Sequence, residues 1–128
     1  MADALSISLY DGVRNCQLKA VDVSDGTGLS NQVILTASSL VPNPGSHMKI
    51  RRIKYSVINM YVRLQWAGAT PGDIAYIGQG MDILDFTDDY AGGFPNNAVT
   101  PTGNIILTTD GQIAGSGFTL TLDLIKGV

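Results

Sequence analysis

Apolar and polar residues alternate with a period of two along much of this chain. The alternation is clearest over residues 5–9, 62–66 and 118–124, where every second residue is apolar. Such a pattern is typical of β-strands that bury one face. Further extended stretches are predicted at residues 13–23, 32–36, 48–57, 74–76, 81–86 and 104–109.

Turn-forming residues separate these stretches, as at Asp11-Gly12, over residues 67–72 and at Asp110-Gly111. Ile50 falls out of phase with the alternation that follows it, which predicts a β-bulge near Arg51-Arg52. No stretch has a convincing helical period. The pattern therefore predicts an all-β fold, an antiparallel β-sandwich or barrel of about eight or nine short strands.

Composition agrees with one helix-poor domain. A length of 128 residues fits a single domain, and 45% hydrophobic residues supply a core. All acidic residues are Asp, and 15 residues are Gly, so residues that favour helices are scarce. We expect a single β domain over residues 1–128, with one long loop at about residues 86–103 that is suited to making contacts.

Features of membrane and secreted proteins are missing from the sequence. No apolar run reaches the ~18–20 residues that span a bilayer. Residues 1–4 carry neither the basic nor the apolar region of a signal peptide. Cys16 is the single cysteine, so no internal disulfide is expected. These features predict a protein with no membrane partner that is made in a reducing cytoplasm.

The formal net charge of −3 hides a segregation of charge along the chain. Residues 26–72 carry five basic and no acidic side chains, whereas residues 73–110 carry six Asp and no basic side chain. The pI of about 4.7 argues against a dedicated nucleic-acid binder, and no direct nucleic-acid contact is expected. The two blocks are complementary, and they can meet within one chain or between copies.

Residues suited to catalysis are sparse. His47 is the single histidine and lies in a loop rich in Pro and Gly, where a surface position is the preferred interpretation. Cys16 lies within a predicted strand with no patterned histidine nearby, so we expect a small core or half-buried residue. Gly78-Gln79-Gly80 lacks the third glycine and the helix of a phosphate-binding loop. We therefore expect no enzymatic activity.

A cluster of acidic residues is the strongest candidate for a metal site. Ca²⁺ prefers several oxygen ligands, which these carboxylates supply. The spacing does not match an EF-hand, and no Glu is present to act as a bidentate ligand. A solvated or partner-contacting acidic loop is preferred, and no metal or other cofactor is expected. The cluster consists of Asp82, Asp85, Asp88 and Asp89.

A basic group precedes this cluster and consists of Lys49, Arg51, Arg52, Lys54 and Arg63. Arg52 and Lys54 share one face of a predicted strand, and Arg63 is expected across from them if the two strands form a hairpin. Positive charges on one sheet face repel one another unless acidic groups or a polyanion neutralise them. Two interpretations stay open: an internally paired, solvated face, and a surface for another subunit or partner.

Three aromatic residues, Tyr61, Trp66 and Tyr76, raise the possibility of a platform on which a sugar stacks. Trp66 shares the face of Val62 and Leu64 and is expected in the core. Only Tyr61 lies on the opposite face of that strand. A carbohydrate-binding module is therefore a less favoured hypothesis, because the sequence indicates no aromatic cluster.

The order of these features along most of the chain resembles a family of small virion structural proteins of tailed bacteriophages. Each segment alone is a common strand pattern, and the resemblance rests on their order and spacing. Within the long loop only Gly93-Phe94-Pro95-Asn96 takes part. The other segments are Asp11-Gly12-Val13-Arg14-Asn15, Gln17-Leu18-Lys19, Ile50-Arg51-Arg52-Ile53-Lys54-Tyr55, Val62-Arg63-Leu64-Gln65-Trp66, Gly103-Asn104-Ile105-Ile106-Leu107-Thr108-Thr109 and Phe118-Thr119-Leu120-Thr121-Leu122-Asp123-Leu124-Ile125-Lys126.

This resemblance implies a non-enzymatic cement or decoration protein on the outer capsid surface of the virion, assembled in the bacterial host cytoplasm. Its partner would be the major capsid protein, and such proteins often form homotrimers. A tail, neck or head-fibre component is the alternative. The residues expected to contact the shell or another subunit are the basic group, the acidic cluster and Phe94.

Overall fold

The computed structural model describes residues 4–12, 15–25, 28–37, 40, 48–86, 94 and 97–125. Within these residues the chain forms nine β-strands and no α-helix. No helix in the described part is long and apolar enough to span a membrane. The strands are β1 (Ala4–Asp11), β2 (Asn15–Asp25), β3 (Gln32–Leu35), β4 (Lys49–Ile58), β5 (Tyr61–Thr70), β6 (Gly72–Ile77), β7 (Gly80–Asp85), β8 (Val99–Asp110) and β9 (Ala114–Ile125).

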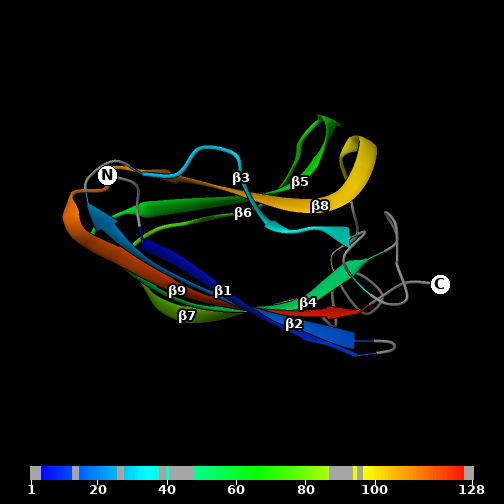
Figure 1. The fold of residues 1–128 in the computed structure, drawn as a ribbon, viewed down its shortest axis with the longest axis horizontal. Coiled ribbons are helices and arrows are strands. Elements are labelled where there is room, and N and C mark those ends of the chain that lie inside the picture. The colour runs from blue at the N-terminus through cyan, green and yellow to red at the C-terminus, as the bar shows by residue number, and fades with distance from the viewer. Residues whose placement is uncertain are drawn as a thin grey trace.

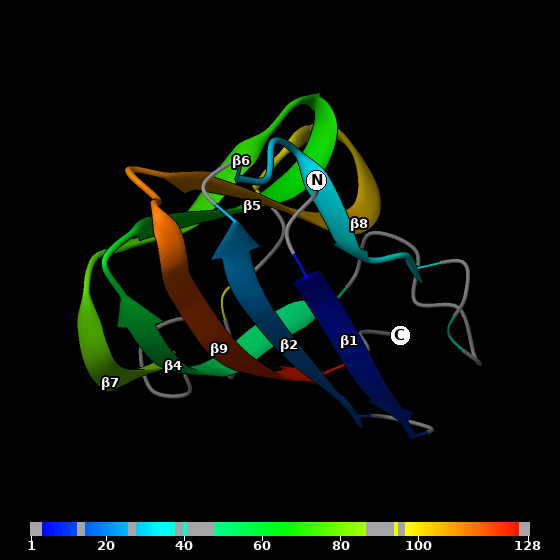
Figure 2. The same ribbon diagram turned by 60° about the vertical axis from the view of Figure 1, so that its left-hand side comes forward.

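The strands form two antiparallel sheets that pack face to face (Figure 1). One sheet has five strands in the order β1-β2-β9-β4-β7, and the other has four in the order β3-β8-β5-β6. Figure 2 shows the five-stranded sheet with its strands side by side. The expected all-β antiparallel sandwich is confirmed.

The pairing of the strands is nested, as in a long hairpin rolled up on itself. β5 pairs with β6, β4 with β7, β3 with β8 and β2 with β9. Rolling this ladder into two layers adds the pairs β4–β9 and β5–β8. This topology is that of an eight-stranded jelly roll, with β1 as an additional edge strand beside β2.

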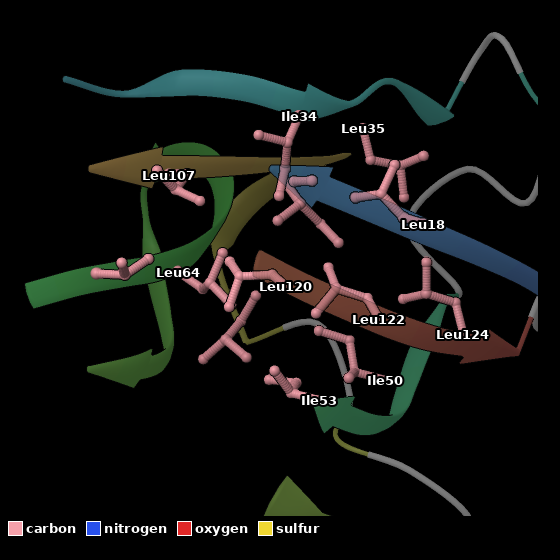
Figure 3. Packing of buried hydrophobic residues seen from close by; sticks show 14 of the residues in the cluster. Leu18, Ile34, Leu35, Ile50, Ile53, Leu64, Leu107, Leu120, Leu122 and Leu124 are labelled. Carbon is pink, nitrogen blue, oxygen red and sulfur yellow. The ribbon is translucent and has the colours of Figure 1, made fainter. Parts of the chain in front are cut away.

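The core lies between the two sheets and is built from the alternating positions of the sequence. Leu120, Leu122 and Leu124 of β9 face Leu64 of β5 and Leu107 of β8 across the sandwich (Figure 3). All five side chains are buried. Burying one such side chain stabilises the fold by about 1.5–3 kcal/mol, so the period-two pattern supplies the main stabilising energy.

The edge strand β1 departs from the sequence expectation. Leu5, Ile7 and Leu9 alternate as predicted, yet the Ile7 and Leu9 side chains remain 40% and 38% exposed. Among the described strands, β1 lies at the edge of the five-stranded sheet, and the opposite sheet has one strand fewer. Alternation therefore identified the strand correctly but overstated its burial.

Strand β4 contains the predicted irregularity. Its register against β9 shifts between Ile50 and Arg52, so the bulge near Arg51-Arg52 is confirmed. The extra residue lets both Ile50 and Ile53 enter the core despite their odd spacing. Arg52 and Lys54 consequently lie on the outer face of the sheet.

The turn predicted at residues 67–72 and the loop predicted at residues 86–103 both include residues that belong to strands in the structure. β5 continues to Thr70 and β8 begins at Val99, because these two extensions pair with each other. Gly68 permits the close approach, since a Cβ added there would lie 2.5 Å from the Val99 carbonyl oxygen. Pro101 and Gly103 resemble loop residues, but here they lie inside a strand.

Candidate functional site

The basic group does not gather on one face. β4 belongs to the five-stranded sheet and β5 to the other, so Arg63 lies on the opposite side of the molecule from Arg52 and Lys54. The expected hairpin is wrong because the chain changes sheets between the two strands. Asn59, with φ 54°, lies in this crossover.

Arg52 lies between two acidic side chains of its own chain. Its Nε is 4.0 Å from Asp85 Oδ2 on β7 and 4.0 Å from Asp123 Oδ2 on β9. Gln17 of β2 extends this row, because its Nε2 donates a hydrogen bond to Asp123 Oδ1 at 2.8 Å. The row crosses four strands at register-matched positions.

Arg63 has an equally local partner on the other sheet. Its Nε and Nη2 donate to Asp73 Oδ1 and Oδ2 at 2.9 and 3.1 Å, which is a two-pronged pair. Arg52–Asp85 and Arg63–Asp73 both join the basic block to the acidic block within one chain. These two arginines therefore support the internally paired interpretation, whereas Lys54 has no ion-pair partner in the described part of the chain.

Reversing the charge of Arg52 tests this row. Arg52→Glu is expected to lower the free energy of unfolding by about 1–2 kcal/mol at low salt, since it replaces two attractions with two repulsions. Lys54→Glu, on the same strand face, should change it by less than ~0.5 kcal/mol. Urea unfolding at low and high salt measures both, and equal destabilisation by the two variants would contradict the pairing.

The acidic cluster is divided by the structure. Asp82 and Asp85 lie three residues apart in β7, so their side chains leave opposite faces of the strand. Asp88 and Asp89 lie outside the described residues. Within the described ranges no group of three or more His, Cys or Asp side chains is placed to hold a metal ion.

Phe94 and Cys16, two further residues considered from the sequence, take part in the packing of the sandwich. Phe94 exchanges backbone hydrogen bonds with Ile50, at 2.7 and 3.0 Å, and its ring centroid lies 5.5 Å from that of Phe86. Phe94 therefore packs against the core as a half-buried residue. Cys16 is buried in the core as expected, while His47 lies outside the described residues.

The outer face of the five-stranded sheet carries an apolar surface that the sequence analysis missed. Met81 and Ile83 of β7 are 81% and 52% exposed, and Ile58 of β4 and Val23 of β2 are each 56% exposed. Between them lie uncharged residues with short side chains and one charged residue, Lys54. We name this surface the apolar outer face and define it by Val21, Val23, Ser56, Ile58, Met81, Ile83, Thr119 and Thr121.

The strand registers place these residues in rows across the sheet. Val21, Thr119, Ser56 and Met81 form one row, and Lys19, Thr121, Lys54 and Ile83 form the next. A hollow of about 460 Å³ opens on this face beside Met81 and Ile83. Leu84 leaves the opposite face of β7 and packs against the core.

The outer face of the four-stranded sheet carries an aromatic pair. Tyr61 of β5 and Tyr76 of β6 have ring centroids 5.8 Å apart, and their side chains are 49% and 59% exposed. Trp66 is fully buried, as expected. The sequence left Tyr61 without an aromatic neighbour because only the β5–β6 register, which pairs Arg63 with Tyr76, reveals the second ring.

Comparison with known proteins adds no further constraint. No protein-family model, curated protein or solved structure matches this chain. The function is therefore argued from the surfaces of the molecule itself.

Proposed function

We propose that this protein is a non-enzymatic component of a tailed-phage virion, a cement or decoration protein that docks on the outer surface of the major capsid protein shell. The apolar outer face is the observation that carries the proposal. It presents Met81, Ile83 and Ile58 to solvent over neighbouring strands of one sheet. A contiguous exposed apolar surface is typical of a protein interaction site.

The dimensions of this face suit part of a protein interface. Its defining residues lie on four strands, over about five residues of each, and with strands ~4.8 Å apart and a rise of ~3.3 Å per residue they cover roughly 300 Å². A standard protein interface buries about 800 Å² on each partner. Adjacent loops can supply the remainder.

The chemistry of the face also suits tight contact. Thr119, Thr121 and Ser56 lie between the apolar side chains and bring no formal charge that would lose hydration on docking. Their short side chains lose little rotamer freedom when they are buried. Lys19 lies beside the face and Lys54 lies within it, between Thr121 and Ile83, and both can steer the face towards an acidic surface on the shell.

The fold suits a protein that holds neighbouring shell subunits together. A shell that holds packaged DNA under pressure is stabilised by a protein that joins neighbouring subunits, and a rigid β-sandwich loses little conformational entropy on docking. Jelly rolls occur in viral capsid proteins and in lectins, so the fold agrees with the proposal without selecting it.

A binding assay with phage heads that lack this protein tests the proposal. Purified protein is expected to co-sediment with such heads in a saturable manner and to raise the temperature at which they open. Binding to isolated tails instead would replace the proposal with the tail, neck or head-fibre alternative. Absence of binding to either particle would overturn both.

Self-association is expected as a homotrimer. Internal pairing of Arg52 and Arg63 removes two of the charges available to link copies, so Lys49, Arg51 and Lys54 are the members of the basic group that remain candidates for subunit contacts. Light scattering on the purified protein measures the mass directly. A strict monomer at millimolar concentration would contradict a preformed trimer and would leave assembly to the shell surface.

A further inference from the structure

The tyrosine pair lies on the sheet opposite the apolar outer face. Tyr61 and Tyr76 project from neighbouring strands, at diagonal positions of the β5–β6 ladder. Their rings are tilted by 40° with centroids 5.8 Å apart, and both residues are about half exposed. Two large rings held on a sheet face in this way offer apolar area that water does not solvate well.

The backbone around Tyr61 restricts its ring. A Cβ added to Gly78 would lie 3.5 Å from Tyr61 Cε1, and one added to Gly111 would lie 3.4 Å from Cδ2. The ring therefore has backbone along both of its edges. Gly111 has φ 69°, which favours glycine, and its N–H donates to Asp110 Oδ1 at 2.8 Å. A ring held in this way loses little entropy when a ligand stacks on it.

Planar polar groups surround the pair. Arg63 is fixed by its two-pronged bond to Asp73, and Gln65 Nε2 also donates to Asp73 Oδ1, at 3.0 Å. Arg63 and Asp110 line a hollow of about 230 Å³ together with both tyrosines. A guanidinium or a carboxylate group can form hydrogen bonds with two neighbouring hydroxyl groups at once. The site therefore offers directional donors and acceptors beside the apolar rings.

The charge of the site selects among ligands. One arginine is outnumbered by Asp73 and Asp110, so the surface is slightly acidic. Phosphate and sulfate groups are therefore disfavoured. The hollow is smaller than the ~300–1,000 Å³ typical of pockets for drug-sized molecules, which suits one ring of a larger chain. A second hollow of about 340 Å³ lies beside Tyr61 and is lined by Asn59, Gln79 and other residues.

We propose that Tyr61 and Tyr76 form a binding site for a neutral oligosaccharide. One pyranose ring stacks on the tyrosine faces, and its hydroxyl groups bond with Arg63 and Asp110, which line the hollow. The chain of sugars continues past Tyr61 into the second hollow. The site is independent of docking by the apolar outer face, because the two surfaces lie on different sheets.

A glycan array of neutral and acidic oligosaccharides, followed by calorimetric titration of the best ligand, tests this site. Wild-type protein is expected to bind neutral glycans. Tyr61→Ala and Tyr76→Ala should each weaken binding roughly tenfold, since each removes one stacking face, while Tyr76→Phe should retain it. Tyr10→Ala is the matched control, because Tyr10 is 72% exposed on the other sheet.

The outcomes separate this proposal from its alternatives. Unaltered melting temperatures in the alanine variants would assign the loss of binding to the site rather than to folding. Sugar binding should vary little with NaCl. Preferred binding of a single-stranded oligonucleotide with a steep salt dependence would overturn the proposal. It would also be overturned if no neutral glycan bound at millimolar concentration, or if Tyr10→Ala weakened binding as much as Tyr76→Ala.

Discussion

Replacing Met81 and Ile83 together with aspartate is expected to weaken docking on the capsid shell about a hundredfold. Apolar side chains at the centre of an interface commonly contribute ~1–2 kcal/mol each or more, and two such losses correspond to this factor. The new carboxylates would also lose their hydration on docking. Both residues are exposed on an edge strand, so folding should be retained. Co-sedimentation with undecorated heads measures the effect.

A matched control distinguishes loss of the docking face from a general effect of added charge. Val99 and Ile113 are 58% and 59% exposed and lie outside the apolar outer face. Replacing both with aspartate adds the same charge, and it should leave docking within a few-fold of wild type. Equal loss of binding in the two double variants would contradict the assignment of the face.

Trp66→Ala is expected to lower the free energy of unfolding by about 3–5 kcal/mol, which is the usual cost of deleting a buried large aromatic side chain. Trp66 is fully buried in β5, between the strands that carry Gly72 and Ile105. A loss of this size approaches the total stability of many domains, ~5–15 kcal/mol. Urea unfolding followed by circular dichroism measures it.

Trp66→Phe is the informative comparison. The Trp66 indole Nε1 is buried and has no hydrogen-bond partner among the described residues. Phenylalanine keeps an aromatic ring and removes this unpaired N–H, whose burial costs about 1–3 kcal/mol. Its net cost should therefore be clearly smaller than that of alanine. Equal destabilisation by the two substitutions would contradict this account, because it would mean that neither the retained ring nor the removal of the unpaired N–H contributes to stability.

The strands were predictable from the sequence because alternation is a local signal. β9 has four apolar residues at every second position, and all four are buried. The bulge in β4 was also visible locally, since Ile50 and Ile53 differ in phase. The ends of β5 and β8 were not predictable in this way. Gly68 and Pro101 resemble loop residues, and only their pairing across the sheet makes them strand residues.

The candidate sites depended on long-range pairing and were predictable only in part. The exposure of Tyr61 was predictable, because Tyr61 lies on the opposite face of its strand from the apolar residues. That Tyr76 lies next to it was not predictable, because this depends on the register between β5 and β6. The sequence showed two complementary charge blocks without indicating where they meet. Arg52 meets Asp85 because β4 pairs with β7, and Arg63 meets Asp73 because β5 pairs with β6. Part of the charge segregation that suggested contacts between copies is therefore explained by ion pairs within one chain.

The number of copies of this chain in each purified virion tests the central claim most directly. Quantitative mass spectrometry of purified particles, calibrated against the major capsid protein, gives this number. A protein that docks on the shell is expected in hundreds of copies, in a fixed ratio to the capsid subunit. A dozen copies or fewer would place the chain at the tail or neck, and its absence from the particles would contradict a role in the virion.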